Sequence, residues 1–497
     1  MTPGMLLLSV ARRIPGRVAV RAGGTERTYG DLFDNAARFA GVLTAHGVRA
    51  GDRVALMMDN RAEALECYLG CLLGGYTAVH VNDRLALPEV QSIVDDAGVA
   101  AFVAPATGRF DPAAGSGRSV SAPVVLEPVF DAAPIAPRPA PPSAPAIIGY
   151  TSGTTGAPKG VVITQENLSR IIRHMPVHDG LRPGSRCAFT GSFSFVAGIW
   201  GVMLPHLYLG GELSFMAGLP PAEWVDRMIR ERSTFTYVPS PLAPAFTEEV
   251  RRRPEVLDSL TGVLHSASAM RPEVMRDLVS VIGDRFVETW GMTETGAPVT
   301  TTVPADWTAA CEADDIYASA GRPAHIAAVR VVGPDGADVP PGEEGELLVQ
   351  SETLFAGYFR RAEATSEALR DGWLHTGDIG RVDRAGYVYI TDRLKDMIVT
   401  GGMNVYPAEV ELALSRMPGV AEAAVFGAPD ERWGETVVAA IVRAPGHTLD
   451  EAAVTAWCRQ HLASYKKPTS VLFLDALPRN AALKVPKPRL RELYARR

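Results

Sequence analysis

Lysine is scarce in this sequence. Of 49 basic residues only six are lysine, and the rest are arginine. They are Lys159, Lys395, Lys466, Lys467, Lys484 and Lys487. We expect such a chain to keep lysine where a compact ammonium is needed and a planar guanidinium fails. The alternative is that the coding sequence is GC-rich and that these six lysines remain in it by chance. Against it, one lysine follows a glycine-rich loop and the other five all lie at or after residue 395.

Other absences each exclude a class of protein. No apolar run reaches the roughly 18 residues of a membrane helix, so no membrane span is expected. The first residues show no secretory signal core or cleavage site. Five cysteines without a CxxC pair indicate reduced thiols and a cytoplasmic protein. The simplest interpretation of Cys67 and Cys71 is that both are thiols buried in the core. A net charge of -7 argues against a nucleic-acid partner.

The pattern of apolar and polar residues changes along the chain. Between residues 28 and 110, apolar runs alternate with amphipathic stretches, which predicts βα units and a largely parallel sheet. From about residue 321, Asp-Gly and Ala-Gly turns separate β-rich runs, which predicts antiparallel hairpins. We therefore predict an α/β protein with two domains. Residues 1–392 form a large domain of βα-type sheets plus a β-rich subdomain, and residues 393–497 form a small, mobile α+β domain.

A loop rich in Gly, Ser and Thr follows a strand-like run in the segment YTSGTTGAPKG. It is not a Walker A motif, because Gly160 follows Lys159 where that motif requires Ser or Thr. Glycines let backbone amides turn toward oxygen anions, and hydroxyls add donors, so the loop is typical of phosphate binding. A flexible linker is the alternative. The predicted phosphate-binding residues are Thr151, Ser152, Gly153, Thr154, Thr155, Gly156 and Lys159.

Two further segments fit the same nucleotide. In ETWGMTETG, Trp290 is suited to stack on a base, and Glu294 is suited to bind Mg²⁺, which prefers one or two carboxylates plus substrate phosphate. In HTGDIG, Asp378 lies between glycines, where a carboxylate can accept from two ribose hydroxyls. Either segment alone is more typical of a capped turn. Together with the loop they indicate a nucleotide site.

These motifs, with DRLKDMIVTGGMNVYPAEVE and the terminal LPRNAALKV, resemble the motif series of the adenylate-forming superfamily. That family includes acyl-CoA synthetases, adenylation domains of peptide synthetases, and luciferases. The motifs stand in family order over almost the whole chain. The tail is most similar to aryl- and acyl-CoA ligases of the halobenzoate-CoA ligase type. The resemblance implies that a carboxylic acid and ATP, with Mg²⁺, form an acyl-adenylate and pyrophosphate, and that CoA then displaces AMP.

The resemblance also implies roles in the first step. The loop holds the β- and γ-phosphates, Trp290 stacks on adenine with Glu288 near the adenine edge, and Thr293 contacts the α-phosphate. Glu294 holds Mg²⁺. Lys484 is the catalytic lysine, whose charge bridges the carboxylate and the α-phosphate. The remaining nucleotide residues implied are Thr289, Gly291, Met292, Asp378 on the ribose, and Arg393.

For the second step, the resemblance implies that the small domain turns about Lys395. Gly401 and Gly402 then let the pantetheine arm pass close to the backbone. The other implied CoA contacts are Trp433, Lys466, Lys467 and Arg84. For Lys466 and Lys467 a solvated pair is an equal alternative. The run HSASAM, 265–270, departs from the family's Gly-Ala-Pro-like run and leaves that loop's conformation open.

The segment GSFSFVAGIWG matches the family's acid-pocket lining. Val196 stands where peptide-synthetase domains carry Asp, and an unpaired buried ammonium costs several kcal/mol, so an α-amino acid is disfavoured. Phe195 makes the gate apolar, and small neighbours leave room for a bulky aryl, polycyclic or medium- to long-chain acid. Alternatively, the small residues only permit close packing. The other predicted pocket residues are Gly198, Ser266, Ala267, Ser268 and Gly291.

Two other functions stay open at this point. The same chemistry loads the phosphopantetheine of a carrier protein, which presents the same thiol arm as CoA. A non-catalytic nucleotide sensor is the alternative from another class. Lys159, Glu294 and Lys484 are all present, which argues against a sensor.

Overall fold

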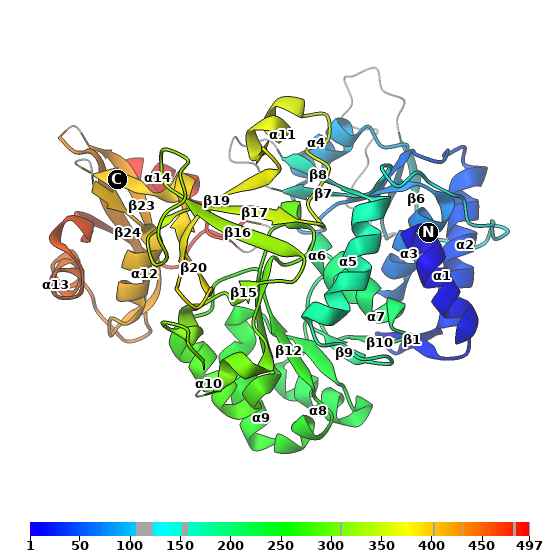
Figure 1. Ribbon diagram of the computed structural model, residues 1–497, viewed down its shortest axis with the longest axis horizontal. Helices are drawn as coiled ribbons and strands as arrows, with labels where there is room; N and C mark the ends of the chain where they lie inside the picture. Colours follow the sequence, from blue (N-terminus) through cyan, green and yellow to red (C-terminus); the bar gives the residue numbers. More distant parts are fainter. Residues whose placement is uncertain are drawn as a thin grey trace. The chain divides into compact units, whose positions relative to one another are not determined.

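The computed structural model describes residues 1–105, 123–151, 158–308, 311–400, 403–430, 432–480 and 484–496. The chain forms two compact units (Figure 1). The first comprises Met1–Val329 and Val349–Leu374, and the second comprises Arg330–Leu348 and His375–Arg497. Helices and strands mix throughout, so the prediction of an α/β protein with a large N-terminal and a smaller C-terminal domain is confirmed.

Two mainly parallel sheets form the first unit. The nine-stranded sheet has the order β15 (Arg322–Pro323), β14 (Thr300–Thr301), β13 (Phe286–Trp290), β12 (Gly262–His265), β11 (Phe235–Tyr237), β9 (Arg186–Phe189), β10 (Glu212–Phe215), β1 (Val18–Ala22), β2 (Thr25–Thr28). The six-stranded sheet has the order β6 (Val124–Leu126), β5 (Ala101–Val103), β3 (Arg53–Leu56), β4 (Thr77–His80), β7 (Pro145–Thr151), β8 (Lys159–Thr164). Strands β3, β4, β5 and β7 pair in parallel, so the expected βα units before residue 110 are confirmed.

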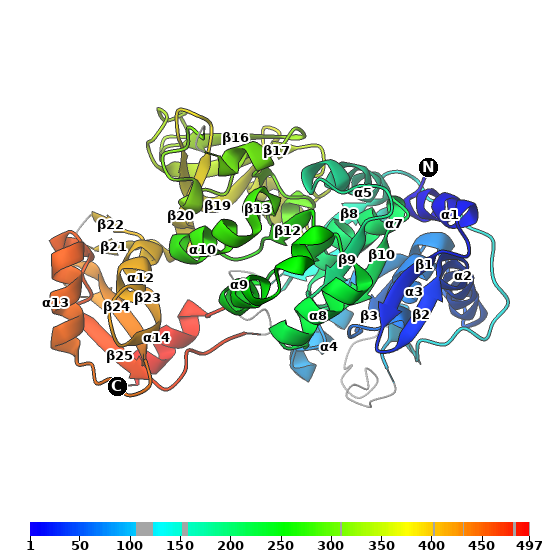
Figure 2. The same cartoon turned by 90° about the horizontal axis from the view of Figure 1, so that it is seen from below.

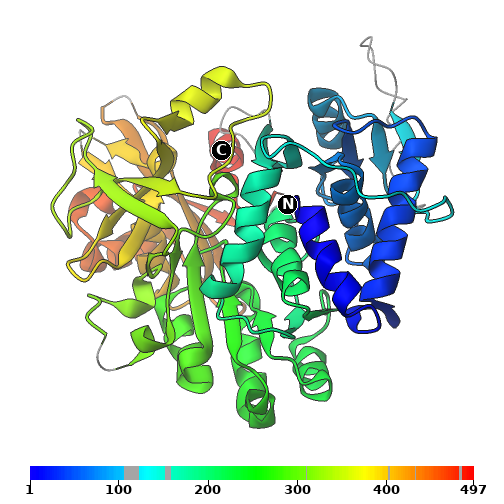
Figure 3. The same cartoon turned by 45° about the vertical axis from the view of Figure 1, so that its right-hand side comes forward.

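The first unit also contains α-helices. They are α1 (Pro3–Arg13), α2 (Tyr29–Ala45), α3 (Ala62–Gly74), α4 (Leu87–Ala97), α5 (Gln165–His178), α6 (Val196–Gly198), α7 (Leu204–Tyr208), α8 (Pro221–Glu231), α9 (Ala243–Arg252), α10 (Pro272–Ile282) and α11 (Ala362–Ala368). Helix α3 contacts β1 of one sheet and β3 and β4 of the other, so it packs between them (Figure 2). Helices α1 and α2, dark blue in Figure 3, pack against each other.

Local sequence explains where helix α5 begins. Thr164 ends β8, and its hydroxyl accepts from the amide of Asn167, whose side chain accepts from the Thr164 amide in return. This reciprocal cap satisfies two backbone donors that the first turn of α5 leaves without helical partners. Residues that read as a strand therefore pass into a helix without a connecting loop.

The rest of the chain is β-rich. One five-stranded sheet contains β16 (Ala327–Val332), β17 (Gly345–Ser351), β19 (Trp373–Val382), β18 (Leu369–Arg370) and β20 (Val388–Arg393). The other contains β22 (Met403–Val405), β21 (Ile398–Thr400), β24 (Gly434–Arg443), β23 (Val420–Asp430) and β25 (Ser470–Leu474), with helices α12 (Pro407–Ser415), α13 (Glu451–His461) and α14 (Lys487–Ala495). Strands β19 and β20 pair antiparallel, so the hairpin predicted there is confirmed.

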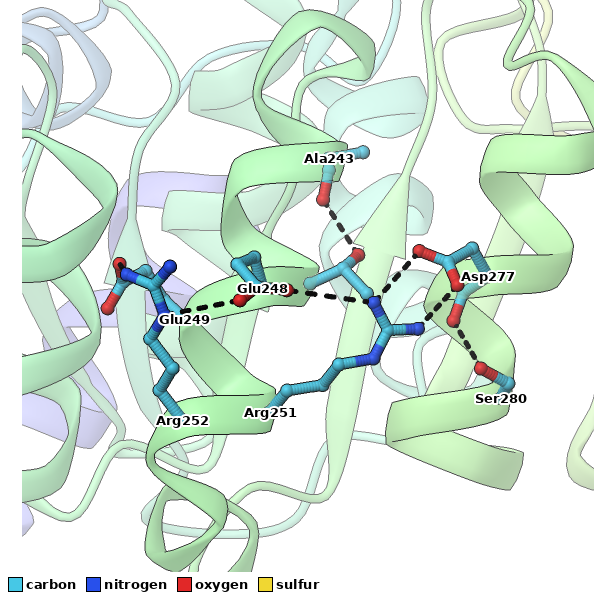
Figure 4. Close-up of polar contacts among 8 residues, drawn as sticks. Ala243, Glu248, Glu249, Arg251, Arg252, Asp277 and Ser280 are labelled. Carbon is cyan, nitrogen blue, oxygen red and sulfur yellow. Dashed lines mark hydrogen bonds and ion pairs between the residues drawn. The ribbon is translucent and has the colours of Figure 1, made fainter.

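Helices α9 and α10 are linked at the surface by charged side chains (Figure 4). Arg251 of α9 forms an ion pair with Asp277 of α10, and it also lies 3.9 Å from Glu248 one turn earlier. Both side chains of the interhelical pair are about half exposed. Solvent screens such pairs, so the apolar contacts between these helices contribute more to stability.

The core confirms one prediction about cysteine. Cys67 and Cys71 on α3 are fully buried free thiols, and burial raises the pKa of each. Both therefore act as small apolar side chains. Within the described ranges, no helix combines the length and apolar character that crossing a membrane requires.

A group of histidines lies at the end of α5. His178 is 6% exposed, and neither of its ring nitrogens has a hydrogen-bond partner among the described residues. Its ring centroid is 5.2 Å from that of His325, which in turn contacts His174. Burial, followed by repulsion from these two imidazoles, lowers the pKa of His178 to about 4.

We expect this histidine to make the fold acid-sensitive. The folded-state pKa lies below the unfolded value of 6.5, so its contribution is fully present above pH 6.5 and is lost as pH falls toward 4. His178→Phe should remove up to about 3 kcal/mol of the loss in unfolding free energy between pH 7 and pH 4. Urea denaturation at the two pH values measures this. His46→Gln, at an exposed imidazole, is the control, and an equal change in both variants would contradict the assignment.

Candidate active site

The two ends of the predicted phosphate loop lie on adjacent antiparallel strands. Thr151, the last residue of β7, is the register partner of Lys159, the first residue of β8. The Thr151 hydroxyl donates to the Lys159 carbonyl at 3.5 Å. The hairpin thus fixes both ends of the loop at one point of the sheet. The predicted loop residues Ser152, Gly153, Thr154, Thr155 and Gly156 lie outside the described residues.

A tyrosine joins Lys159 to the predicted magnesium ligand. The Lys159 ammonium lies 5.1 Å from the centroid of the Tyr358 ring, a cation–π distance. The Tyr358 hydroxyl donates to Oε1 of Glu294 at 2.9 Å. Glu294 is 7% exposed, and its carbonyl accepts from the amide of Phe355 at 2.8 Å. The fold therefore brings Lys159 and Glu294, 135 residues apart in sequence, to one aromatic ring.

Backbone pairing holds this tyrosine in place. Tyr358 forms an isolated antiparallel bridge with Val161 of β8, and the Phe359 amide donates to the Gly160 carbonyl at 2.7 Å. Tyr358 was not predicted as a site residue. Nothing in its local sequence marks it, because its position depends on pairing between segments almost 200 residues apart.

Thr293, the predicted α-phosphate contact, lies in a crowded place beside the end of β7. A methyl group added at Gly149 would lie 3.4 Å from Cγ2 of Thr293 and only 2.9 Å from Cγ1 of Val196. Trp200 would also be 3.4 Å away. Gly149 therefore sets the distance between the predicted nucleotide contact Thr293 and the predicted pocket residue Val196.

Strand β13 carries three predicted nucleotide residues in different environments. Glu288 is buried and accepts from Nδ1 of His265 at 2.7 Å. Burial raises the pKa of Glu288, and His265 opposes that rise. The Thr289 hydroxyl donates to the His265 carbonyl at 3.2 Å, so it too bonds within the protein. Trp290, at the strand end, is half-buried against the core. Met292 begins the next turn, its amide donating to the Thr295 hydroxyl at 3.0 Å.

The predicted acid-pocket residues do not all face open space. A Cβ at Gly198 would lie 2.9 Å from Cζ of Phe189, and one at Gly291 would lie 2.9 Å from Cα of Pro298. At both positions the small residue permits close packing. In the loop after β12, Ser266 accepts through its carbonyl from the Tyr237 hydroxyl at 3.3 Å, and Ala267 has φ = 74°, which is left-handed and costly for alanine.

The gate region pairs an aromatic ring with a cation. Phe195 precedes α6 and is 37% exposed, while Val196 is 7% exposed. The guanidinium carbon of Arg84, predicted to contact CoA, lies 5.9 Å from the Phe195 ring centroid. Ser268, another predicted acid-pocket residue, is exposed, and its hydroxyl lies 2.8 Å from that of Ser240.

In the second unit, two predicted nucleotide-binding residues, Asp378 and Arg393, form an ion pair. Nε of Arg393 lies 2.6 Å from Oδ1 of Asp378, and these residues are opposite each other on β20 and β19. Asp378 is 3% exposed, and its amide donates to the Thr376 hydroxyl at 3.0 Å. Arginine thus orients the buried carboxylate, which can accept from hydroxyl groups.

The predicted hinge and catalytic lysines are both exposed. Lys395 lies in the 3₁₀ turn Leu394–Asp396 that follows β20. The Lys484 amide donates to the side chain of Asn480 at 3.0 Å, and its carbonyl accepts from the Asn480 amide at 2.9 Å. This reciprocal pair fixes the backbone that carries the ammonium.

The predicted CoA residues of the second unit differ in their partners. Trp433 is 46% exposed, with the guanidinium of Arg432 4.6 Å from its ring centroid. Lys466 contacts both carboxylate oxygens of Glu409, at 2.6 and 2.7 Å, and this contact raises its pKa against the effect of burial. Lys467 donates to the Ser464 carbonyl at 2.8 Å. Gly401 and Gly402 lie outside the described residues.

Known proteins have sequences similar to that of this chain over nearly all of its length. The AMP-binding enzyme family model matches residues 7–359, and the AMP-binding enzyme C-terminal domain matches residues 409–484. The chain belongs to the AMP-binding enzyme family. A feruloyl-CoA synthase of an Amycolatopsis species is 38% identical over 490 residues, which are 97% of this chain and 97% of the relative. An indoleacetate–CoA ligase of Aromatoleum aromaticum is 35% identical over 97% of this chain and 96% of the relative.

Solved structures agree with this family. An o-succinylbenzoate CoA synthetase from Bacillus subtilis, in complex with the acyl-adenylate intermediate OSB-AMP, is 28% identical, with a TM-score of 0.88, over 98% of this chain and 97% of that one. ATP-bound MatB from Rhodopseudomonas palustris is 30% identical, with a TM-score of 0.89 and 99% of each chain covered. The predicted adenylate-forming family is thereby confirmed, as is the enzyme class, an AMP-forming acid–thiol ligase. The sensor alternative is not supported.

The environment of Glu294 fits a magnesium ion in this AMP-binding enzyme. Among the described residues, no group of three or more His, Cys, Asp or Glu is arranged to hold a metal. Mg²⁺ bound together with nucleotide needs fewer, because phosphate and water supply the other ligands. A buried carboxylate oriented by the Tyr358 hydroxyl is suited to supply one ligand.

Tyr358→Phe tests whether this orientation matters in this AMP-binding enzyme. The substitution removes the hydroxyl that positions the Glu294 carboxylate, and loss of such an outer partner costs about 10- to 100-fold in metal affinity. We expect the Mg²⁺ concentration for half-maximal ATP–pyrophosphate exchange to rise about tenfold. Tyr76→Phe, whose hydroxyl bonds Thr44 instead, is the control. An unchanged Mg²⁺ requirement would show that Tyr358 does not position the ligand.

Gly149→Ala tests the contact between Thr293 and Val196. The added methyl forces apart groups that would lie 2.9 to 3.4 Å from it, and small displacements of reacting groups are costly. We expect kcat/KM for adenylation to fall about tenfold or more. Gly201→Ala is the matched control, because no atom lies within 4 Å of a Cβ at that position. Similar losses in both variants would indicate a general folding defect.

Proposed function

We propose that the chain is an ATP-dependent carboxylic acid–CoA ligase that acts through an acyl-adenylate, using Mg²⁺. The observation that supports the proposal is the cluster of Lys159, Tyr358 and Glu294, in which one tyrosine contacts an ammonium with its ring and a carboxylate with its hydroxyl. Among the relatives, the Bacillus subtilis synthetase has also been solved with ATP and a magnesium ion, at 28% identity. Feruloyl-CoA synthase and indoleacetate–CoA ligase act on acids and CoA by name.

In the first step, the protein mainly positions reactants and stabilises charge. Lys159 holds the β- and γ-phosphates, Trp290 stacks on adenine, and Asp378 binds the ribose. Thr293 contacts the α-phosphate while the acid's carboxylate attacks it. Lys484 bridges the two, so its positive charge offsets the negative charge that builds at phosphorus. Pyrophosphate leaves with the electron pair of the broken P–O bond.

In the second step, we propose that residues 393–497 turn relative to residues 1–392, with the pivot at Lys395. Its exposed position in a short turn after β20 leaves its dihedral angles free to change. Lys484 then leaves the site. Gly401, Gly402 and Trp433 take its place around the pantetheine arm, whose thiolate displaces AMP. Arg84 meets the 3′-phosphate of CoA.

The acid itself is proposed to be bulky and apolar rather than an α-amino acid. Val196 is buried and uncharged, so a substrate ammonium beside it would lack a counter-charge. Relatives named for ferulate, indoleacetate and long-chain fatty acids support an aryl, polycyclic or medium- to long-chain acid. Gly198 and Gly291 contribute less to this volume than their size implies, because both pack against protein atoms.

A carrier protein is the second candidate acceptor. A relative from Streptomyces coeruleorubidus, 33% identical over 97% of this chain, is a fatty acid–[acyl-carrier-protein] ligase by name. Free CoA and a carrier's phosphopantetheine present the same thiol arm, so the adenylation site is compatible with both.

A panel of carboxylic acids, with ATP and Mg²⁺ and with or without CoA, tests the proposal. We expect AMP and pyrophosphate as products, and α-amino acids at least about a hundredfold slower in kcat/KM than the best apolar acid. Lys484→Ala should lose adenylation yet convert a supplied acyl-adenylate to thioester. ADP as sole product would overturn the proposal. Rapid α-amino acid turnover would overturn only its substrate part.

A further inference from the structure

A serine, a histidine and a glutamate form a continuous hydrogen-bonded row in the first unit. The Ser240 hydroxyl lies 2.7 Å from Nε2 of His265. Nδ1 of the same imidazole lies 2.7 Å from Oε2 of Glu288. Because an ionised carboxylate only accepts, Nδ1 carries the proton and Nε2 is left to accept from the serine. These are the contacts by which a base activates a nucleophilic hydroxyl.

The fold places the three residues on neighbouring parallel strands. Ser240 follows β11, His265 ends β12, and Glu288 lies on β13, where it is the register partner of His265. In open α/β sheets, ligands bind at the carboxyl ends of the strands. Ser240 also begins the 3₁₀ turn Ser240–Leu242 that leads directly into α9, a strand–turn–helix setting that exposes a nucleophilic hydroxyl in other folds.

Burial differs along the row in the way such a centre requires. His265 is fully buried and Glu288 is 7% exposed, so water does not compete for their contact. Ser240 is partly exposed, and the hydroxyl of the exposed Ser268 lies 2.8 Å from it. The serine is therefore the end of the row that an acyl compound reaches.

We propose that Ser240, His265 and Glu288 form a second catalytic centre that hydrolyses activated acyl compounds, such as esters and thioesters. Ser240 is the nucleophile, His265 the general base, and Glu288 the residue that positions the imidazole. This hydrolysis requires neither ATP nor Mg²⁺, and it shares Glu288 with the predicted nucleotide site.

The reaction balances in two transfers. Oγ of Ser240 bonds to the acyl carbon while its proton passes to Nε2 of His265. The bond from that carbon to the leaving group breaks, and the leaving group takes the electron pair and the proton. Water then attacks the acyl-serine and gives a proton to Nε2, and that proton returns to Oγ as the ester bond breaks. The net result is one acid and one alcohol or thiol for each water consumed.

A fluorophosphonate probe, which reacts covalently with activated serine hydroxyls, tests the proposal on the full-length protein. We expect peptide mass spectrometry to find the label on Ser240, and Ser240→Ala to lose it while retaining ATP–pyrophosphate exchange. Because the base contributes about a hundredfold, His265→Gln should slow labelling by that factor. Ser268→Ala is the matched control and should still be labelled at Ser240. No label on Ser240, or equal rates with and without His265, would overturn the proposal.

Glu288→Gln examines the positioning role and also guards against a His265 variant that fails to fold. We expect Glu288→Gln to slow labelling of Ser240, because an amide does not hold the proton on Nδ1 of His265 as a carboxylate does. Glu288→Asp keeps the carboxylate and should restore part of the labelling rate. Equal labelling rates in Glu288→Gln and the natural protein would overturn the role of Glu288.

Hydrolysis of p-nitrophenyl butyrate and of butyryl-CoA then separates esters from thioesters. Turnover of either compound that is lost in Ser240→Ala supports the proposal, and turnover of both that survives the substitution contradicts it. The probe and these substrates need no nucleotide. Failure here would therefore leave the proposed ligase function untouched, and failure of the ligase would leave this result standing.

Discussion

The pairing of residues 355–359 with strand β8 is the constraint on which the candidate active site depends. Backbone hydrogen bonds at Gly160 and Val162, on either side of the bridge between Val161 and Tyr358, fix the position of Tyr358. The tyrosine in turn holds the Glu294 carboxylate and receives the Lys159 ammonium on its ring. Without this pairing, the lysine and the carboxylate would belong to separate elements with no shared partner. The geometry proposed for phosphate and metal thus depends on a few backbone hydrogen bonds between segments almost 200 residues apart.

The features that could be predicted from the sequence are those that depend on local residues. Alternating apolar runs predicted the parallel strands β3, β4 and β5, and an Ala-Gly turn predicted the β19–β20 hairpin. The motif order identified the family, because each motif is a short contiguous run. Such features depend on periodicity and turn chemistry, which a single segment carries by itself.

Contacts between distant segments were not predictable in the same way. Nothing near Tyr358 indicates that it bonds Glu294, and nothing near Glu288 indicates that it bonds His265. For a related reason, the sequence did not show whether a small residue lines a pocket or packs against other residues. Glycine is required wherever two surfaces approach closely, whether one of them is a ligand or a protein ring. Only the packing against Phe189 and Pro298 distinguishes these cases at Gly198 and Gly291.

The ion pair between Lys466 and Glu409 has a consequence for any anion that approaches this surface. Both oxygens of Glu409 already contact the ammonium, so a phosphate that approaches Lys466 competes with a carboxylate for its positive charge. The free energy gained is then the difference between two ion pairs. Added salt screens both, so an affinity based on this exchange depends weakly on ionic strength. In this arrangement Lys466 discriminates by the geometry and charge density of the anion more than by its charge alone.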